Sequence, residues 1–195
     1  SYPQCDLFGG AIIPHFDSGP PIWNMPEACL MMLYAQTPPL DEGEIAPFNV
    51  SGGNMAIRSA LRDGGWSFGG GFMVGGSGLM GEDSDFVRRV AAAGHKVGFA
   101  PTARVGHIVH AEQTRWLWIQ KRFFRSGRAL FVFDDLRRDD RGRVLVVFPW
   151  WRLRRAAARA LRLTVPMNAR QRTVRFMGTR ELAYDLGALT QAILL

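Results

Sequence analysis

The chain has 195 residues, 47% hydrophobic and 21% charged, which suits one folded globular domain of ordinary size. Its two cysteines, Cys5 and Cys29, are too few for a disulfide framework or a zinc cluster, so a reducing compartment is expected, and no apolar run is long enough to span a bilayer. The net charge of +7 is uneven, because residues 1–100 carry 5 basic and 10 acidic side chains and residues 101–195 carry 19 and 7. The second half is therefore expected to face phosphates, in a ligand, on nucleic acid or at an anionic membrane.

The first third of the chain predicts loops around two short strands. The apolar run at residues 7–13 predicts a strand that ends at Pro14. The segments SGPPIW and TPPLDEGEIAP are too rich in proline for a helix or a central strand. The segment NVSGGNMAI predicts a second strand, and a brief helix at residues 58–63 is expected to stop at the two glycines that follow.

A glycine-dense loop and an acidic helix follow. Residues 65–81, GWSFGGGFMVGGSGLMG, contain so many glycines that the loop is expected to wrap closely around something. Residues 82–93 predict an amphipathic helix with acidic residues in its first turn, as the helix dipole favours. Its buried face is expected to be formed by Phe86, Val87, Val90, Ala91 and Ala93. The segments KVGFAP and ARVGHIV then predict two short strands.

The basic half predicts three helices. The first covers residues 112–133, and the second is the basic amphipathic segment WRLRRAAARALRL. The last, RELAYDLGALTQAILL, has Leu182, Leu186, Leu189 and Ile193 in register along one apolar stripe. The second helix carries four arginines at helical spacing, Arg152, Arg155, Arg159 and Arg162. Two interpretations stay open for it: it packs back on the domain with its arginines in water, or its arginines attach it to the inner membrane leaflet.

Two motifs that suggest phosphate or metal binding fail on their context. The glycine run contains Gly76-x-Gly78-x-x-Gly81, which matches the dinucleotide fingerprint, but the helix it opens begins with Glu82 and Asp83, which would repel a pyrophosphate. Asp83-Ser84-Asp85 has the letters of an Asp-x-Asp metal motif, yet glycines precede it instead of a buried strand.

A catalytic base remains as the functional interpretation of the acidic helix start. A base needs a rigid mount and a nearby loop that shapes the pocket, which Asp83 beside Glu82 and the glycine loop would provide. The alternative is a plain acidic first turn of a helix. His107 and His110 are spaced as His-x-x-His, which alone is too little to define a zinc site.

Taken in order, several segments resemble one enzyme family. GGNMAIRSALRDGGW, the glycine loop, GEDSDFVRRVAAAGHKVGFAPTARVGH and RWLWIQKRFFRSGRAL are similar, over roughly residues 5–133, to the later half of inverting family 2 glycosyltransferases with the GT-A fold. The resemblance implies an α/β protein: the C-terminal part of a GT-A fold over residues 1–133, and a basic amphipathic helical extension over residues 134–195.

The resemblance also implies roles for individual residues. Asp83 would be the base that deprotonates the acceptor hydroxyl, with Glu82 beside it on the acceptor. His107 would be a ligand of a divalent cation, Mn²⁺ or Mg²⁺, and Arg115 would approach the diphosphate. Further substrate contacts are implied for Asn54, Trp66, Gly76, Gly78 and Asp85.

The implied reaction moves a sugar, with inversion, from a nucleotide-diphosphate donor to a lipid-linked, polysaccharide or glycoconjugate hydroxyl. The protein would work in the cytoplasm, peripherally on the inner face of the cell membrane, without a nucleic-acid partner. Residues 1–50 match neither the family's nucleotide-binding strands nor its Asp-x-Asp strand, so the donor half is expected to be absent and the chain alone inactive. Gln113-Thr114-Arg115-Trp116 only approximates the Gln-x-x-Arg-Trp of polymerising members. The alternative is a non-catalytic basic module that binds an anionic membrane or nucleic acid.

Overall fold

A computed structural model describes residues 4–20, 25–68, 79–132, 137–138, 144–145, 148–163 and 172–194. The chain divides into two compact units. The first is formed by Ser1–Gly19, Met25–Met73 and Gly81–Ala111, and the second contains Glu112–Leu195. The sequence analysis placed the division after residue 133, whereas here the segment from Glu112 onward groups with the C-terminal helices.

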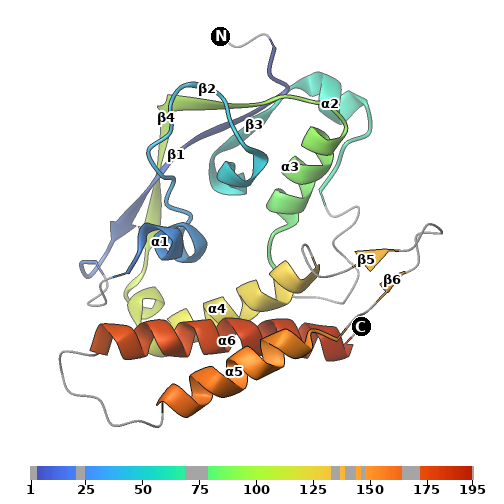
Figure 1. The fold of residues 1–195 in the computed structure, drawn as a ribbon. Helices are drawn as coiled ribbons and strands as arrows, with labels where there is room; N and C mark the ends of the chain where they lie inside the picture. Colours follow the sequence, from blue (N-terminus) through green and yellow to red (C-terminus); the bar gives the residue numbers. More distant parts are fainter. Residues whose placement is uncertain are drawn as a thin grey trace. The chain divides into compact units, whose positions relative to one another are not determined.

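A four-stranded mixed sheet forms the frame of the first unit (Figure 1). The strands are β1 (Leu7–Phe16), β2 (Gly43–Glu44), β3 (Met55–Ile57) and β4 (Val97–Val109). Their order across the sheet is β2-β4-β1-β3, with β1 parallel to β4 and the two short strands antiparallel to their neighbours. The chain is therefore a mixed α/β protein, as predicted.

Both long strands differ from their predicted limits. β1 continues through Pro14, which pairs with His107 of β4, and the prediction that the strand ends at Pro14 was wrong. The proline is tolerated because the pairing of β1 with β3 stops at Gly9. The two predicted strands at residues 96–109 are one strand, β4, interrupted by a register shift.

Helices and short 3₁₀ turns pack around this sheet. They are α1 (Glu27–Tyr34), η1 (Pro47–Asn49), η2 (Gly52–Asn54), α2 (Ser59–Asp63) and α3 (Glu82–Ala92). α3 begins as predicted and buries Phe86, Val87 and Val90 completely. Those side chains pack on apolar residues of the sheet and of the loops and α2 around it, namely Leu7, Val50, Leu61 and Val97. The sequence analysis took the region of α1 as loop.

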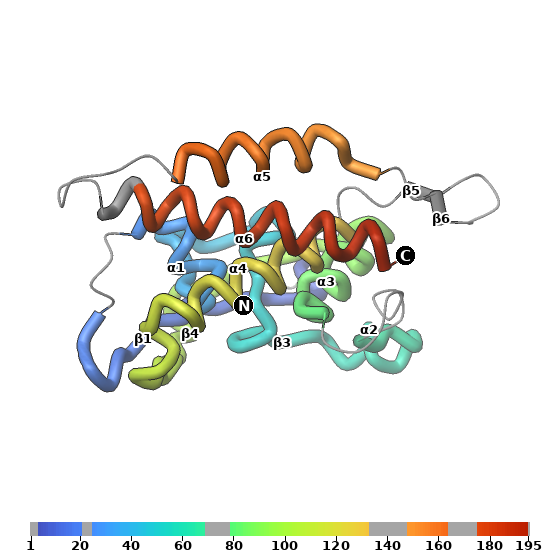
Figure 2. The backbone as a smooth tube through the Cα atoms, turned by 90° about the horizontal axis from the view of Figure 1, so that it is seen from below, coloured from blue at the N-terminus to red at the C-terminus, as the bar shows by residue number. Residues whose placement is uncertain are grey.

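The second unit is built from helices. They are η3 (Ala111–Thr114), α4 (Trp116–Leu130), α5 (Trp150–Leu163) and α6 (Arg172–Leu194), with a small hairpin of β5 (Arg137–Arg138) and β6 (Val144–Leu145). α6 lies between α4 and α5 and contacts both, which Figure 1 and Figure 2 show from two directions. Within the described ranges, none of these helices is both long enough and apolar enough to cross a bilayer.

The buried face of α5 is the opposite of the one predicted, and that of α6 differs in part. In α6, Leu186 is 45% exposed and Ile193 is 72% exposed, while Asp185 and Gln191 are fully buried. In α5, Arg152 is buried against the rest of the unit instead of facing water or lipid. The apolar periodicity located α5, whereas α6 begins at Arg172, before the predicted start at Arg180. Of the predicted stripe in α6, Leu189 is buried and Leu186 and Ile193 are exposed.

Candidate functional site

Asp83 is anchored at the start of α3 by a backbone amide from another part of the chain. Its Oδ2 accepts a hydrogen bond of 2.7 Å from the Gly52 N–H, and its Oδ1 accepts one of 2.9 Å from the Ser84 N–H. A Cβ on Gly52 would lie 2.9 Å from the Asp83 Cβ, so the turn comes this close only because a glycine stands there. The amide groups of the helix start stabilise negative charge at this position. The carboxylate is thus oriented and only partly exposed.

The two acidic neighbours of Asp83 have different surroundings. Glu82 is exposed. Asp85 forms an ion pair of 2.7 Å with Arg89, one helical turn further on, and Arg89 also donates to the Ser67 carbonyl at 2.9 Å. Asp85 is therefore paired within α3, and the substrate contact that the resemblance implied for it stays a prediction.

Asn54 joins the same turn, η2, to the centre of the sheet. Its Nδ2 donates to the Ala11 carbonyl at 3.0 Å and to the Ala103 carbonyl at 2.8 Å. Ala11 lies where the register of β1 against β4 shifts: Gly10 pairs with Ala100, and Ala11 pairs with Arg104. The amide of Asn54 thus satisfies carbonyl groups at this irregularity, and both of its hydrogens are used.

His107 has one ring nitrogen fixed by the backbone. The Nδ1 atom lies 2.7 Å from the Tyr34 carbonyl oxygen, which can only accept, so Nδ1 carries the hydrogen. In the neutral ring, Nε2 is then the atom with a lone pair. Metal-ligating histidines commonly have this arrangement, in which one nitrogen donates to a carbonyl and the other meets the ion.

Burial raises the pKa of the Tyr34 phenol to about 12.

His107 is the residue on which a cation site would depend, and it supplies a single ligand. Across the described ranges, no group of three or more histidine, cysteine, aspartate or glutamate side chains is placed to hold a metal ion. Within those ranges, His107 and at most one further side chain of these types could therefore share a cation.

The structure groups only some of the predicted residues. Asp83 and Asn54 meet through η2, since one binds Gly52 of that turn and the other belongs to it. Trp66 packs on the core and meets the His95 ring edge-on, with centroids 5.7 Å apart, beyond the C-terminal end of α3. That end is about 15 Å from the helix start at 1.5 Å per residue, so Trp66 does not adjoin Asp83.

Three predicted residues cannot be related to Asp83. Gly76 and Gly78 lie outside the described residues. Arg115 immediately precedes α4, where its carbonyl accepts from the Ile119 N–H at 3.1 Å, and it belongs to the second unit.

Sequence reasoning missed Gly52, whose N–H positions the candidate base. The signal for it was the pair of glycines before Asn54, because adjacent glycines in a strand pattern indicate a close approach of another part of the chain.

Comparison of the chain with protein-family models, with curated proteins and with solved structures found no match.

Proposed function

We propose that this chain carries the acceptor side of an inverting glycosyltransferase with a GT-A fold. The observation that supports it most is the Asp83 carboxylate, held by the Gly52 N–H at the start of α3. A base for a hydroxyl group needs such a fixed mount, and the mixed sheet and α3 provide it. The order of motifs that resembles family 2 enzymes supplies the reaction class.

The proposed reaction is a single displacement. The acceptor hydroxyl gives its proton to Asp83 as its oxygen forms a bond to the anomeric carbon of the donor sugar. The bond from that carbon to the diphosphate oxygen breaks, and the electron pair leaves with the nucleoside diphosphate. Glu82, exposed next to Asp83, would contact the acceptor. Arg115 would offset charge on the leaving diphosphate.

A divalent cation would share that last task, with His107 as one of its ligands. When bound, the cation would stabilise the negative charge that develops on the diphosphate. The residue fits this role because its Nδ1–H is donated to the Tyr34 carbonyl, which leaves Nε2 to coordinate. The acceptor would be a lipid-linked or glycan hydroxyl, met in the cytoplasm at the inner face of the membrane.

The substitution Asp83→Asn tests the base. Asparagine can keep the contact with the Gly52 N–H through its side-chain oxygen but cannot accept the acceptor proton. We expect kcat to fall by ~10²–10⁴ with little change in the KM of the donor. The assay uses a panel of nucleotide sugars with Mn²⁺ or Mg²⁺ and the full-length protein.

Asp63→Asn is the matched control, because Asp63 is an exposed carboxylate of the same unit that contacts Arg62 at 2.9 Å. It should keep normal turnover. Near-normal turnover in the Asp83→Asn variant would remove Asp83 from the base role. Absence of transfer and of donor hydrolysis across the whole panel in the unsubstituted protein would argue against a glycosyltransferase altogether.

A further inference from the structure

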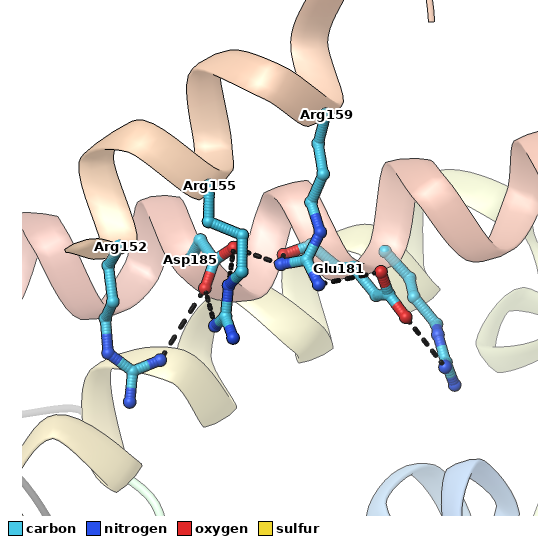
Figure 3. Close-up of polar contacts among 6 residues, drawn as sticks. Arg152, Arg155, Arg159, Glu181 and Asp185 are labelled. Atoms are coloured by element: carbon cyan, nitrogen blue, oxygen red, sulfur yellow. Dashed lines mark hydrogen bonds and ion pairs between the residues drawn. The ribbon is translucent and has the colours of Figure 1, made fainter. Parts of the chain in front are cut away.

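α5 is an amphipathic helix with its charged side turned inward. Figure 3 shows Arg152, Arg155 and Arg159 of α5 directed towards Asp185 of α6. Arg155 Nε donates to Asp185 Oδ2 at 3.0 Å, and Arg159 contacts both Asp185 and Glu181, the latter at 2.8 Å. The hydrogen bond to Asp185 raises the pKa of the Arg155 guanidinium, so that guanidinium stays charged.

The buried carboxylate of Asp185 explains this orientation. Its side chain is fully buried, and a buried carboxylate without cationic partners is strongly destabilising. The only described side chains that form ion pairs with Asp185 are these three arginines of α5. They lie three or four residues apart, so they share one side of the helix, which must then face α6.

The apolar side of α5 consequently faces away from α6. Trp150 is 66% exposed, Leu153 is 40% exposed and Leu161 is 72% exposed, and the alanines between them are exposed apart from Ala156. α6 repeats the pattern on a smaller scale, with Leu186 and Ile193 exposed. Ordinary surface helices have the opposite arrangement, so this face requires an apolar surrounding of its own.

The charge of α5 indicates what surrounds its exposed apolar face. The exposed side of α5 also carries Arg154 and Arg162, and the helix contains no acidic residue. Exposed indoles, small apolar residues and arginines on the exposed side of one helix are typical of helices that lie in the headgroup region of an anionic bilayer.

We propose that α5 lies flat on an anionic membrane surface, with Trp150, Leu153 and Leu161 among the lipids and Arg154 and Arg162 on the headgroup phosphates. The membrane contact expected from sequence used the arginine stripe, three members of which are instead paired with α6. This attachment goes beyond the proposed sugar transfer and does not depend on it, and its readout is lipid binding rather than activity.

The test is co-sedimentation of the 195-residue chain with vesicles of phosphatidylcholine, with and without phosphatidylglycerol. We expect binding to the anionic vesicles, weakened by salt. The double substitution Trp150→Ser with Leu161→Ser should abolish it. Phe48→Ser, at a similarly exposed apolar position of the first unit, is the matched control and should bind normally. Arg154→Gln and Arg162→Gln should each weaken binding about fivefold.

Circular dichroism and tryptophan fluorescence accompany each variant, so that loss of folding is not taken for loss of binding. Blue-shifted emission on adding anionic vesicles, absent from the Trp150→Ser variant, supports insertion of that indole. Undiminished binding by the folded double variant would overturn the proposal. So would a chain that ignores vesicles and sediments as a dimer that the same double substitution dissociates, because the face would then serve a second copy.

Discussion

Asn54 shows how one side chain can connect a sheet to a candidate catalytic group. Its amide bridges Ala11 and Ala103 across the irregularity between β1 and β4, while Gly52, two residues earlier, holds Asp83. Gly10 leaves the space, since a Cβ there would lie 2.3 Å from Asn54 Nδ2 and 2.4 Å from the Ala103 oxygen. The position of Asp83 is therefore set by the interior of the sheet.

We expect Asn54→Ala to lower the free energy of unfolding by about 1–3 kcal/mol, because two carbonyl groups lose their donor. Urea denaturation of the chain measures this. Thr102→Ala, at an exposed position in the same irregular part of β4, should change stability little. If Asn54 acts only through substrate contact, as the resemblance implied, its variant will show unchanged stability and a higher KM.

At the scale of the element, the crossing of α4 and α6 brings two backbones into contact. A Cβ on Gly127 of α4 would lie 1.9 Å from the backbone carbonyl oxygen of Tyr184, and one on Gly187 of α6 would lie 1.9 Å from the backbone carbonyl oxygen of Phe124. Neither oxygen can move without displacing a helix. The two glycines therefore set the distance between α4 and α6.

Gly187→Ala should destabilise the chain by about 1–3 kcal/mol through overpacking. Helix propensity alone would favour the alanine by about 1 kcal/mol, so the sign of the change separates the two effects. Gly178→Ala is the matched control in the same helix. Its Cβ would meet only the end of the Leu163 side chain, at 3.3 Å, and we expect it to be neutral or stabilising in thermal unfolding. A stabilising Gly187→Ala would contradict the close crossing.

The sequence predicted elements well where the deciding residues are local. α3 has its acidic start and its buried Phe86, Val87 and Val90 within 11 residues, and both its existence and these three buried positions are confirmed. Ala93, which was also expected to be buried, is exposed at the end of the helix. β4 was divided into two because the residue that bridges its irregularity, Asn54, lies 49 positions from Ala103. The prediction of which side of α5 is buried was wrong for the same reason, since Asp185 lies 30 positions from Arg155.

At the scale of the whole molecule, the candidate site is only partly supplied by the described residues. The single Asp-x-Asp of the sequence, Asp83-Ser84-Asp85, is engaged in the structure: Asp83 by the Gly52 N–H and Asp85 by Arg89. It is therefore not arranged to hold a cation between donor phosphates. The place of Asp83 at a helix start was predictable from the sequence, whereas its relation to Arg115 was not, because the two residues belong to different units.

We expect the 195-residue chain alone to show no metal-dependent binding of nucleotide sugars by calorimetry at millimolar ligand. The physical reason is that its one Asp-x-Asp pair already has protein partners. Tight binding that needs Mn²⁺ and is lost in His107→Ala would show that the nucleotide site lies within these residues. Asp63→Asn again serves as the control for non-specific loss of charge.

The ion-pair cluster at Asp185 has a consequence for how α5 could change during evolution. A single carboxylate fixes the rotation of α5 about its own axis, because it selects which side of that helix faces α6. Replacement of Asp185 by leucine would remove that selection and favour rotation of α5 by about half a turn, with its indoles inward and its arginines in water. One substitution in α6 could thus convert the exposed apolar face of α5 into a hydrophilic one, without any change in the sequence of α5.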